Sequence, residues 1–135
     1  MALVVPPGSF LLDGGVFLKA ARGSGTTNPS VLSILRDNHS RCFVSMISIW
    51  QLLMRFKAGL EQLPEPALPM LQYERSILGV HSLAVQEDYL AHLTSLDDLR
   101  YNAFDQMLIC QAKHHSMSFI TDRDIFSGLD LEVIH

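Results

Sequence analysis

The pattern of a helix with one apolar face runs through the stretch NAFDQMLICQAK, from Asn102 to Lys113. Asn102 is a good N-cap residue, and Asp105 follows where a carboxylate meets free backbone N–H groups and the positive end of the helix dipole. Apolar side chains recur at helical spacing and predict a buried stripe formed by Phe104, Met107 and Leu108. His114 and His115 end the pattern and are expected to cap the last carbonyl groups. Asp105 is one position off the stripe, so we expect it beside the core at the start of the helix.

A second acid, Asp13, occupies a different setting. It ends the apolar run Phe10-Leu11-Leu12, which predicts a buried strand. Such a strand delivers its last residue to the carboxyl edge of the sheet, where open α/β folds have their binding crevices. Asp105 by itself can be a helix-capping carboxylate or part of such a site, and the residues around it leave both interpretations open.

The composition is that of one compact domain. The chain has 135 residues, of which 48% are hydrophobic and 18% charged. This predicts a single folded domain over residues 9–135, preceded by a lead-in over residues 1–8. The net charge of −4 and the pI near 5.8 exclude a basic protein that coats nucleic acid. They do not exclude a nuclease whose bound metal ions contact the phosphate.

Cysteine use and hydropathy predict a cytoplasmic protein that does not enter a membrane. Cys42 and Cys110 each lie inside an apolar element without a CxxC motif or a Cys/His pairing around it, which predicts buried, reduced thiols. No apolar run approaches the roughly twenty residues of a membrane helix. Residues 1–8 also lack the basic-then-apolar order of a signal peptide.

Strand and helix patterns alternate and predict an α/β fold with a parallel sheet flanked by helices on both faces. The strands are expected at Ser9–Asp13, Arg41–Ser45, Val80–Ala84, Met117–Thr121 and Leu131–Ile134. Helices or helical turns are expected, besides the one from Asn102, at Val16–Arg22, Ser30–His39, Ile47–Ala58, Met70–Leu78, Val85–Leu93 and Arg123–Phe126. Glycine and proline predict a turn at Gly14-Gly15 and loops at 23–27 and Leu60–Pro69.

Four motifs occur in an order and at separations that resemble a known family. They are Phe10–Asp13, Val44–Trp50, Phe104–Ala112, and Ile120-Thr121 with Phe126. Together they resemble PIN domains, specifically the VapC toxin ribonucleases of bacterial toxin–antitoxin systems, from about Ser9 to the end of the chain. The resemblance implies a sheet of about five parallel strands with acids at its carboxyl edge. In the family these acids hold Mg²⁺ or Mn²⁺, and a metal-activated water cuts RNA. An antitoxin partner and a homodimer are also implied.

The resemblance assigns roles to residues of this chain. Asp13 and Asp105 correspond to metal ligands, and carboxylate oxygens suit hard cations such as Mg²⁺. Assisting roles follow for Gln51, which can orient a water, and for Asp122 or Asp124. The residues expected to face the substrate are Ser48, Asn102, Arg55 and Arg123. Ser48, Gln51 and Arg55 share one helical stripe, which can also be an ordinary solvated face. The homodimer interface is expected at the apolar residues Trp50, Met54 and Leu60, together with the proline-rich loop Leu60–Pro69.

The sequence departs from the family at several pocket positions. Gln51 stands where the family has Glu, Asn102 where it often has Asp, and Gly14 where Thr or Ser is usual. Arg123 stands where the family's Thr-x-Asp motif has its acid. Removing a unit charge about 4 Å from a cation costs roughly 1 to 4 kcal/mol of binding. Arg123 can also pair with Asp105 or Asp13 and occupy the place of the metal.

Two functions therefore remain open at the level of the sequence. One is a metal-dependent endoribonuclease of the VapC kind, with weak activity. The other is a PIN-like domain without catalysis that binds RNA, an antitoxin-like protein or its own copy.

Overall fold

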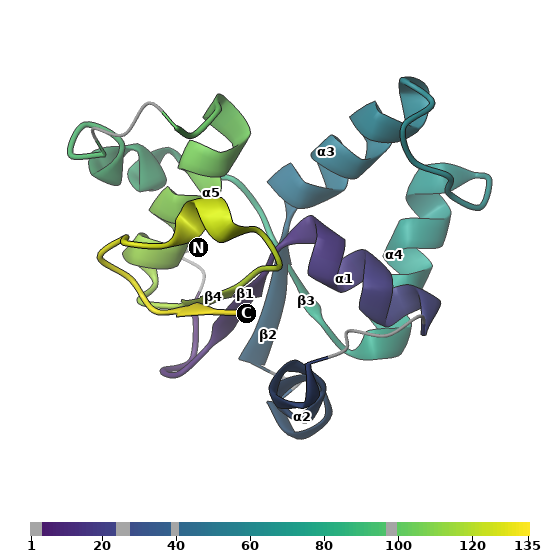
Figure 1. The fold of residues 1–135 in the computed structure, drawn as a ribbon, viewed down its shortest axis with the longest axis horizontal. Coiled ribbons are helices and arrows are strands. Elements are labelled where there is room, and N and C mark those ends of the chain that lie inside the picture. Colours follow the sequence, from purple (N-terminus) through teal and green to yellow (C-terminus); the bar gives the residue numbers. More distant parts are fainter. Residues whose placement is uncertain (1–3, 24–27, 39–40, 97–99) are drawn as a thin grey trace.

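The fold is built on a sheet of five parallel strands in the order β3-β2-β1-β4-β5 (Figure 1). The computed structural model describes residues 4–23, 28–38, 41–96 and 100–135. The predicted loop over 24–27, the predicted helix end at His39 and lead-in residues 1–3 lie outside these ranges. The strands are β1 (Phe10–Leu12), β2 (Cys42–Ser45), β3 (His81–Leu83), β4 (Ser118–Ile120) and β5 (Val133–Ile134). The predicted α/β fold with a parallel sheet is confirmed.

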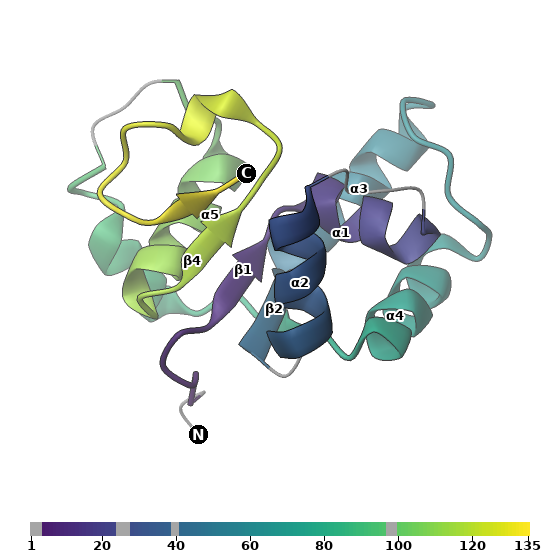
Figure 2. The same ribbon diagram turned by 60° about the horizontal axis from the view of Figure 1, so that its bottom comes forward.

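Helices cover both faces of this sheet. The α-helices are α1 (Gly14–Arg22), α2 (Pro29–Asn38), α3 (Met46–Lys57), α4 (Ala67–Leu78) and α5 (Ala103–His114), and the 3₁₀-helices are η2 (Glu87–His92) and η3 (Asp124–Phe126). Helices α1 to α4 lie on one side and α5 on the other, a division visible in Figure 1 and again in Figure 2. Alternate strand residues point to opposite faces, so Leu12 packs with the first group and Leu11 with the second.

Two helices begin two or three residues earlier than the sequence pattern predicts. Gly14-Gly15 is the first turn of α1 rather than a loop turn, because the Asp13 carboxylate caps the helix by accepting a hydrogen bond from Gly14 N at 2.9 Å. A Cβ atom on Gly14 would lie 3.3 Å from Ser48 Cβ, so glycine allows α1 to approach α3 closely. Helix α4 begins at Ala67 instead of Met70. Its first turn includes Pro69, which is tolerated there because first-turn N–H groups have no intrahelical partner.

Other bounds also differ from the prediction. The expected helix Val85–Leu93 is the shorter 3₁₀-helix η2, and the last strand begins at Val133 instead of Leu131. Cys42 and Cys110 are buried thiols, as predicted, and burial raises the pKa of the Cys42 thiol to about 11. None of the helices in the described part of the chain has the length and apolar character needed to cross a membrane.

The strand order creates a crevice at the carboxyl edge of the sheet. From β1 the chain continues to β2 and β3 on one side, and later to β4 and β5 on the other. Open α/β sheets bind ligands at such a point of reversal, outside the carboxyl ends of the strands. Asp13 N donates a hydrogen bond to Ile120 O at 2.8 Å, which continues the β1–β4 pairing one residue further. This bond holds Asp13 at the crevice, beside the end of β4.

Candidate site at the carboxyl edge of the sheet

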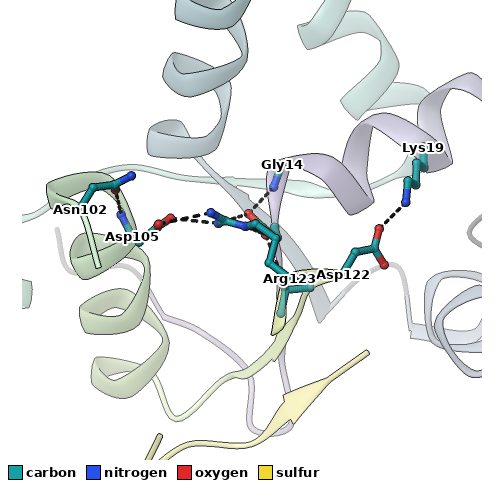
Figure 3. A network of polar contacts seen from close by, with 8 residues as sticks. Gly14, Lys19, Asn102, Asp105, Asp122 and Arg123 are labelled. Carbon is teal, nitrogen blue, oxygen red and sulfur yellow. Dashed lines mark hydrogen bonds and ion pairs between the residues drawn. The ribbon is translucent and has the colours of Figure 1, made fainter. Parts of the chain in front are cut away.

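Asp13 and Asp105 converge on the guanidinium group of Arg123. Figure 3 shows the Arg123 side chain directed toward Asp105. Arg123 donates to Asp13 through Nε, 2.8 Å from Oδ2, and through Nη2, 3.0 Å from Oδ1. It donates to Asp105 through Nη2, 2.9 Å from Oδ1, and through Nη1, 3.2 Å from Oδ2. Because one nitrogen contacts an oxygen of each acid, the two carboxylates lie within a few ångströms of each other. Arg123 thus pairs with both acids, where the sequence predicted one or the other.

The two carboxylates are buried and held in place by the elements around them. Asp13 is 5% exposed and Asp105 2%. Asp13 Oδ2 also accepts a hydrogen bond from the Thr121 hydroxyl at 2.7 Å. Asp105 lies in the first turn of α5, where its backbone N donates to Asn102 Oδ1 at 2.9 Å. Asn102 is therefore the N-cap of α5, as predicted. Charges this deeply buried require close partners, and Arg123 supplies the positive one.

Arg123 is positioned by the segment that joins β4 to η3. Its backbone N donates to Thr121 Oγ1 at 3.0 Å, and its guanidinium carbon lies 4.8 Å from the centre of the Phe126 ring. Burial lowers the pKa of Arg123, but the hydrogen bonds and negative charges of Asp13 and Asp105 raise this pKa further, with a net rise above the ordinary value. The guanidinium group is therefore a permanent cation between the two acids.

A cleft of about 510 Å³ opens beside this cluster. It is lined by residues that the sequence assigned to a pocket, namely Ser48, Gln51, Arg55, Asn102, Asp122 and Arg123. The stripe of Ser48, Gln51 and Arg55 on α3 therefore faces the cleft and is not simply a solvated face. A larger depression of about 800 Å³ lies between α1, α4 and the loop that precedes α4. Asp13 lines the smaller cleft but not this depression, so we place the candidate site at the smaller cleft.

Asp122 and Asp124, the proposed assisting acids, do not join the cluster. Asp122 lines the cleft, but its Oδ2 accepts a hydrogen bond from Lys19 Nζ at 2.6 Å, and both side chains are about half exposed (Figure 3). Asp124 begins η3, is exposed and does not line the cleft. Lys19 was not singled out from the sequence, because no local signal links it to an acid 103 positions later.

The side chains at this site, as arranged, do not fit a divalent cation. Within the described residues, no group of three or more His, Cys, Asp and Glu side chains is placed to hold a metal ion. All four oxygens of Asp13 and Asp105 already accept hydrogen bonds from Arg123. Mg²⁺ demands oxygen ligands at about 2.0 to 2.1 Å, and here it would stand beside a fixed positive charge. Gln51 and Asn102 add no negative charge to offset that repulsion.

Comparison with solved structures identifies the fold. The chain is similar to a chain of the DNA-bound VapBC complex from Salmonella typhimurium, with a TM-score of 0.69 and 17% identity over 93% of this chain and 96% of that one. A chain of a toxin–antitoxin complex from Klebsiella pneumoniae has a TM-score of 0.64 and 17% identity over 94% of this chain and 97% of that one. A chain of FitAcB from Neisseria gonorrhoeae has a TM-score of 0.62 and 22% identity over 93% of this chain and 96% of that one. No protein-family model matches the sequence, and no curated protein matches it. The chain has the PIN-like fold that its motifs predict, the fold of the chains it matches in VapBC and FitAB complexes.

Proposed function

We propose that this protein is the toxin-like member of a toxin–antitoxin pair and that it acts by binding a partner protein, without metal-dependent cleavage of RNA. The proposed partner is an antitoxin-like protein. Its support is the similarity, over nearly the whole length of both chains, to chains from complexes of this kind. The acidic cluster then stabilises the fold beside the cleft and has no catalytic role.

The observation that carries this proposal is the position of Arg123 between Asp13 and Asp105. Metal-dependent hydrolysis relies on a cation that lowers the pKa of a bound water and offsets charge on the phosphate. A guanidinium group coordinates no water in this way. Its raised pKa also prevents it from taking a proton. With both carboxylates committed to Arg123, no free acid of this cluster is left to serve as a base.

A metal-dependent endoribonuclease of the VapC kind is the second candidate. It is favoured by the convergence of Asp13 and Asp105 beside a cleft that Ser48, Gln51 and Arg55 also line. Arg55 is exposed at this cleft and has the charge needed to contact an RNA phosphate. This function requires a cation to displace the Arg123 guanidinium from both acids.

Self-association and a cytoplasmic location stay predictions. The surface available for a homodimer is an apolar stripe on α3 and the turn after it. Met46, Trp50 and Met54 are spaced four residues apart and are 47%, 50% and 48% exposed, and Leu60 is 65% exposed. Trp50 contacts the Phe104 ring edge-on, with ring centres 4.7 Å apart, so the stripe continues to the rim of the cleft.

An RNA cleavage assay separates the two candidates. The purified protein and an Asp105→Asn variant are incubated with a mixed RNA substrate in Mg²⁺ and in Mn²⁺. We expect the natural protein to cleave no more RNA than the variant does, because Arg123 stays paired with the acids in the presence of either ion. A contaminating nuclease would cleave equally in both samples. Cleavage that only the natural protein supports, with the variant folded by circular dichroism, would overturn the proposal and establish the nuclease.

A further inference from the structure

One nitrogen of Arg123 lies at the point between the two acids. Nη2 is 3.0 Å from Asp13 Oδ1 and 2.9 Å from Asp105 Oδ1, so it is nearly equidistant from the two carboxylates. A single cation bridging two carboxylates would take the same place. The outer nitrogens, Nε and Nη1, each hold one further carboxylate oxygen, so the planar group binds both acids through two oxygens each. Such paired contacts are the strongest geometry that arginine offers to carboxylates.

The rest of the segment fixes the guanidinium from behind. Thr121, which is fully buried, joins both parts of the cluster, because its hydroxyl donates to Asp13 Oδ2 and accepts from Arg123 N. The Phe126 ring lies under the guanidinium. The arginine side chain is therefore held in one position by its backbone, by its aromatic neighbour and by both acids.

The two acids and the arginine together keep one negative charge. Asp13 and Asp105 carry two negative charges and Arg123 carries one positive charge. Of the other residues that line the cleft, Gln51 and Asn102 are neutral, whereas Arg55, Glu61 and Asp122 are charged. A divalent cation added to this arrangement would be repelled by Arg123 and would have to break its four hydrogen bonds.

We propose that Arg123 is a built-in cation that takes the place of a metal ion, makes the Asp13–Asp105 site complete, and keeps divalent cations out. This inference goes beyond the proposed function, because it assigns the exclusion of metal to one side chain. Once the guanidinium is removed, the same two carboxylates, still placed by the α1 and α5 N-termini, face each other with no positive charge between them. A cation then relieves their repulsion.

Four forms of the protein test this inference by Mn²⁺ titration calorimetry and by thermal unfolding with and without Mn²⁺. They are the natural protein, Arg123→Gln, the charge-retaining control Arg123→Lys, and the double variant Arg123→Gln/Asp105→Asn. We expect Arg123→Gln to bind Mn²⁺ at least about tenfold more tightly than the natural protein, and its melting temperature to rise with Mn²⁺. Arg123→Lys should resemble the natural protein. The double variant should lose the gain, because one carboxylate is gone.

Each remaining outcome also decides the inference. If Arg123→Gln does not fold without metal, its circular dichroism spectrum should become native when Mn²⁺ is added, but not when NaCl of equal ionic strength is added. Failure of Mn²⁺ to restore the fold, or to bind a folded Arg123→Gln more tightly than the natural protein, would overturn the inference. Binding that survives in the double variant would place the ion elsewhere and would overturn it as well. Metal-dependent RNA cleavage by the natural protein would defeat the proposed function together with this inference, whereas failure of Mn²⁺ to bind Arg123→Gln would defeat this inference alone.

Discussion

The two ends of α5 carry side-chain clusters of opposite character. At the N-terminal end, Asp105 shares the guanidinium of Arg123 with Asp13 through charge-assisted hydrogen bonds. At the C-terminal end, aromatic and imidazole rings pack against one another with centres 5.0 to 5.3 Å apart, and the residues are Tyr89, His92, His114 and His115. Tyr89 Oη lies 2.8 Å from His115 Nε2, and His92 Nε2 lies 3.2 Å from His114 Nδ1. The first cluster is held together by ion pairs, whereas the second is held together by ring contacts and hydrogen bonds.

This difference separates what stabilises the site from what responds to pH. Arg123 has a pKa raised above its ordinary value, so its charge persists at neutral and acidic pH. His115 behaves in the opposite way, because burial and then the neighbouring His114 lower its pKa. The ionic end faces the cleft, and the imidazole end lies twelve residues along the helix, at its other terminus. We therefore expect Arg123 to keep its charge as the pH falls through the range in which His115 takes up a proton.

The largest effect should come from removing an acid of the ionic cluster. Asp13→Ala deletes the N-cap of α1, the acceptor of the Thr121 hydroxyl and half of the partners of Arg123. A helix cap contributes about 1 kcal/mol, and breaking a buried ion pair costs several kcal/mol. Arg123 keeps Asp105 and is partly exposed, so we expect a total loss of about 2 to 4 kcal/mol in the free energy of unfolding. Urea unfolding measures this loss.

Asp122→Ala is the matched control for that measurement. Asp122 is also an aspartate at the cleft with a basic partner, but its contact with Lys19 is solvent-exposed. Exposed ion pairs contribute about 0 to 1 kcal/mol. Equal losses for the two variants would mean that the buried cluster contributes no more than a surface contact, and the contrast between the ends of α5 would lose its energetic basis.

Much of the ionic cluster could be predicted from the sequence, because local signals mark its members. An apolar run followed by Asp13 predicts an acid at the end of a strand, and Asn102 predicts the start of the helix that carries Asp105. Their convergence follows from the geometry of parallel sheets, since residues after the strands meet at one edge. Arg123 was expected to contact one of the acids. Whether it binds one or both depends on the distance between them, which no local pattern contains.

The imidazole cluster shows where sequence patterns fail. His115 is the C-cap of α5, in agreement with the prediction, and its backbone N donates to Gln111 O at 3.2 Å. The side chains of His114 and His115, however, form hydrogen bonds with His92 and Tyr89 of η2, which the sequence did not predict. That contact depends on how η2 packs across α5, a tertiary arrangement without a periodic signal. The prediction of a turn at Gly14-Gly15 was wrong for a similar reason. Glycine favours a turn locally, but the close approach of α1 to Ser48 decides its conformation.

An intermediate effect is expected from the hydroxyl of Tyr89. Tyr89→Phe keeps the buried ring and removes only the group that bonds to His115 Nε2. A hydrogen bond of this kind contributes about 1 kcal/mol, and the loss should fall in that range. Tyr73→Phe is the matched control because Tyr73 is 57% exposed. Urea unfolding should show a loss for Tyr89→Phe and none for Tyr73→Phe. Unchanged stability of Tyr89→Phe would show that the ring contacts alone hold this cluster.

The smallest effect is a dependence of stability on pH that originates at His115. Its folded-state pKa lies below the ordinary 6.5, so between these two values the unfolded chain binds a proton that the folded chain does not. Stability therefore rises with pH across this window and is lost as the pH falls from neutral through 6.5 and below. The groups around the imidazole are Tyr89, which bonds to it, and His114, whose charge opposes its protonation. Replacing His115 by Gln removes this proton uptake.

We expect the free energy of unfolding of the natural protein, measured in urea at a series of pH values below 7, to fall more steeply than that of His115→Gln. His135→Gln is the control, because His135 is exposed at the end of the chain and distant in sequence from this cluster. It should keep the slope of the natural protein. A natural protein and His115→Gln with identical slopes would show that the imidazole end of α5 does not set the pH response. The two ends of the helix would then differ in chemistry but not in their response to acid.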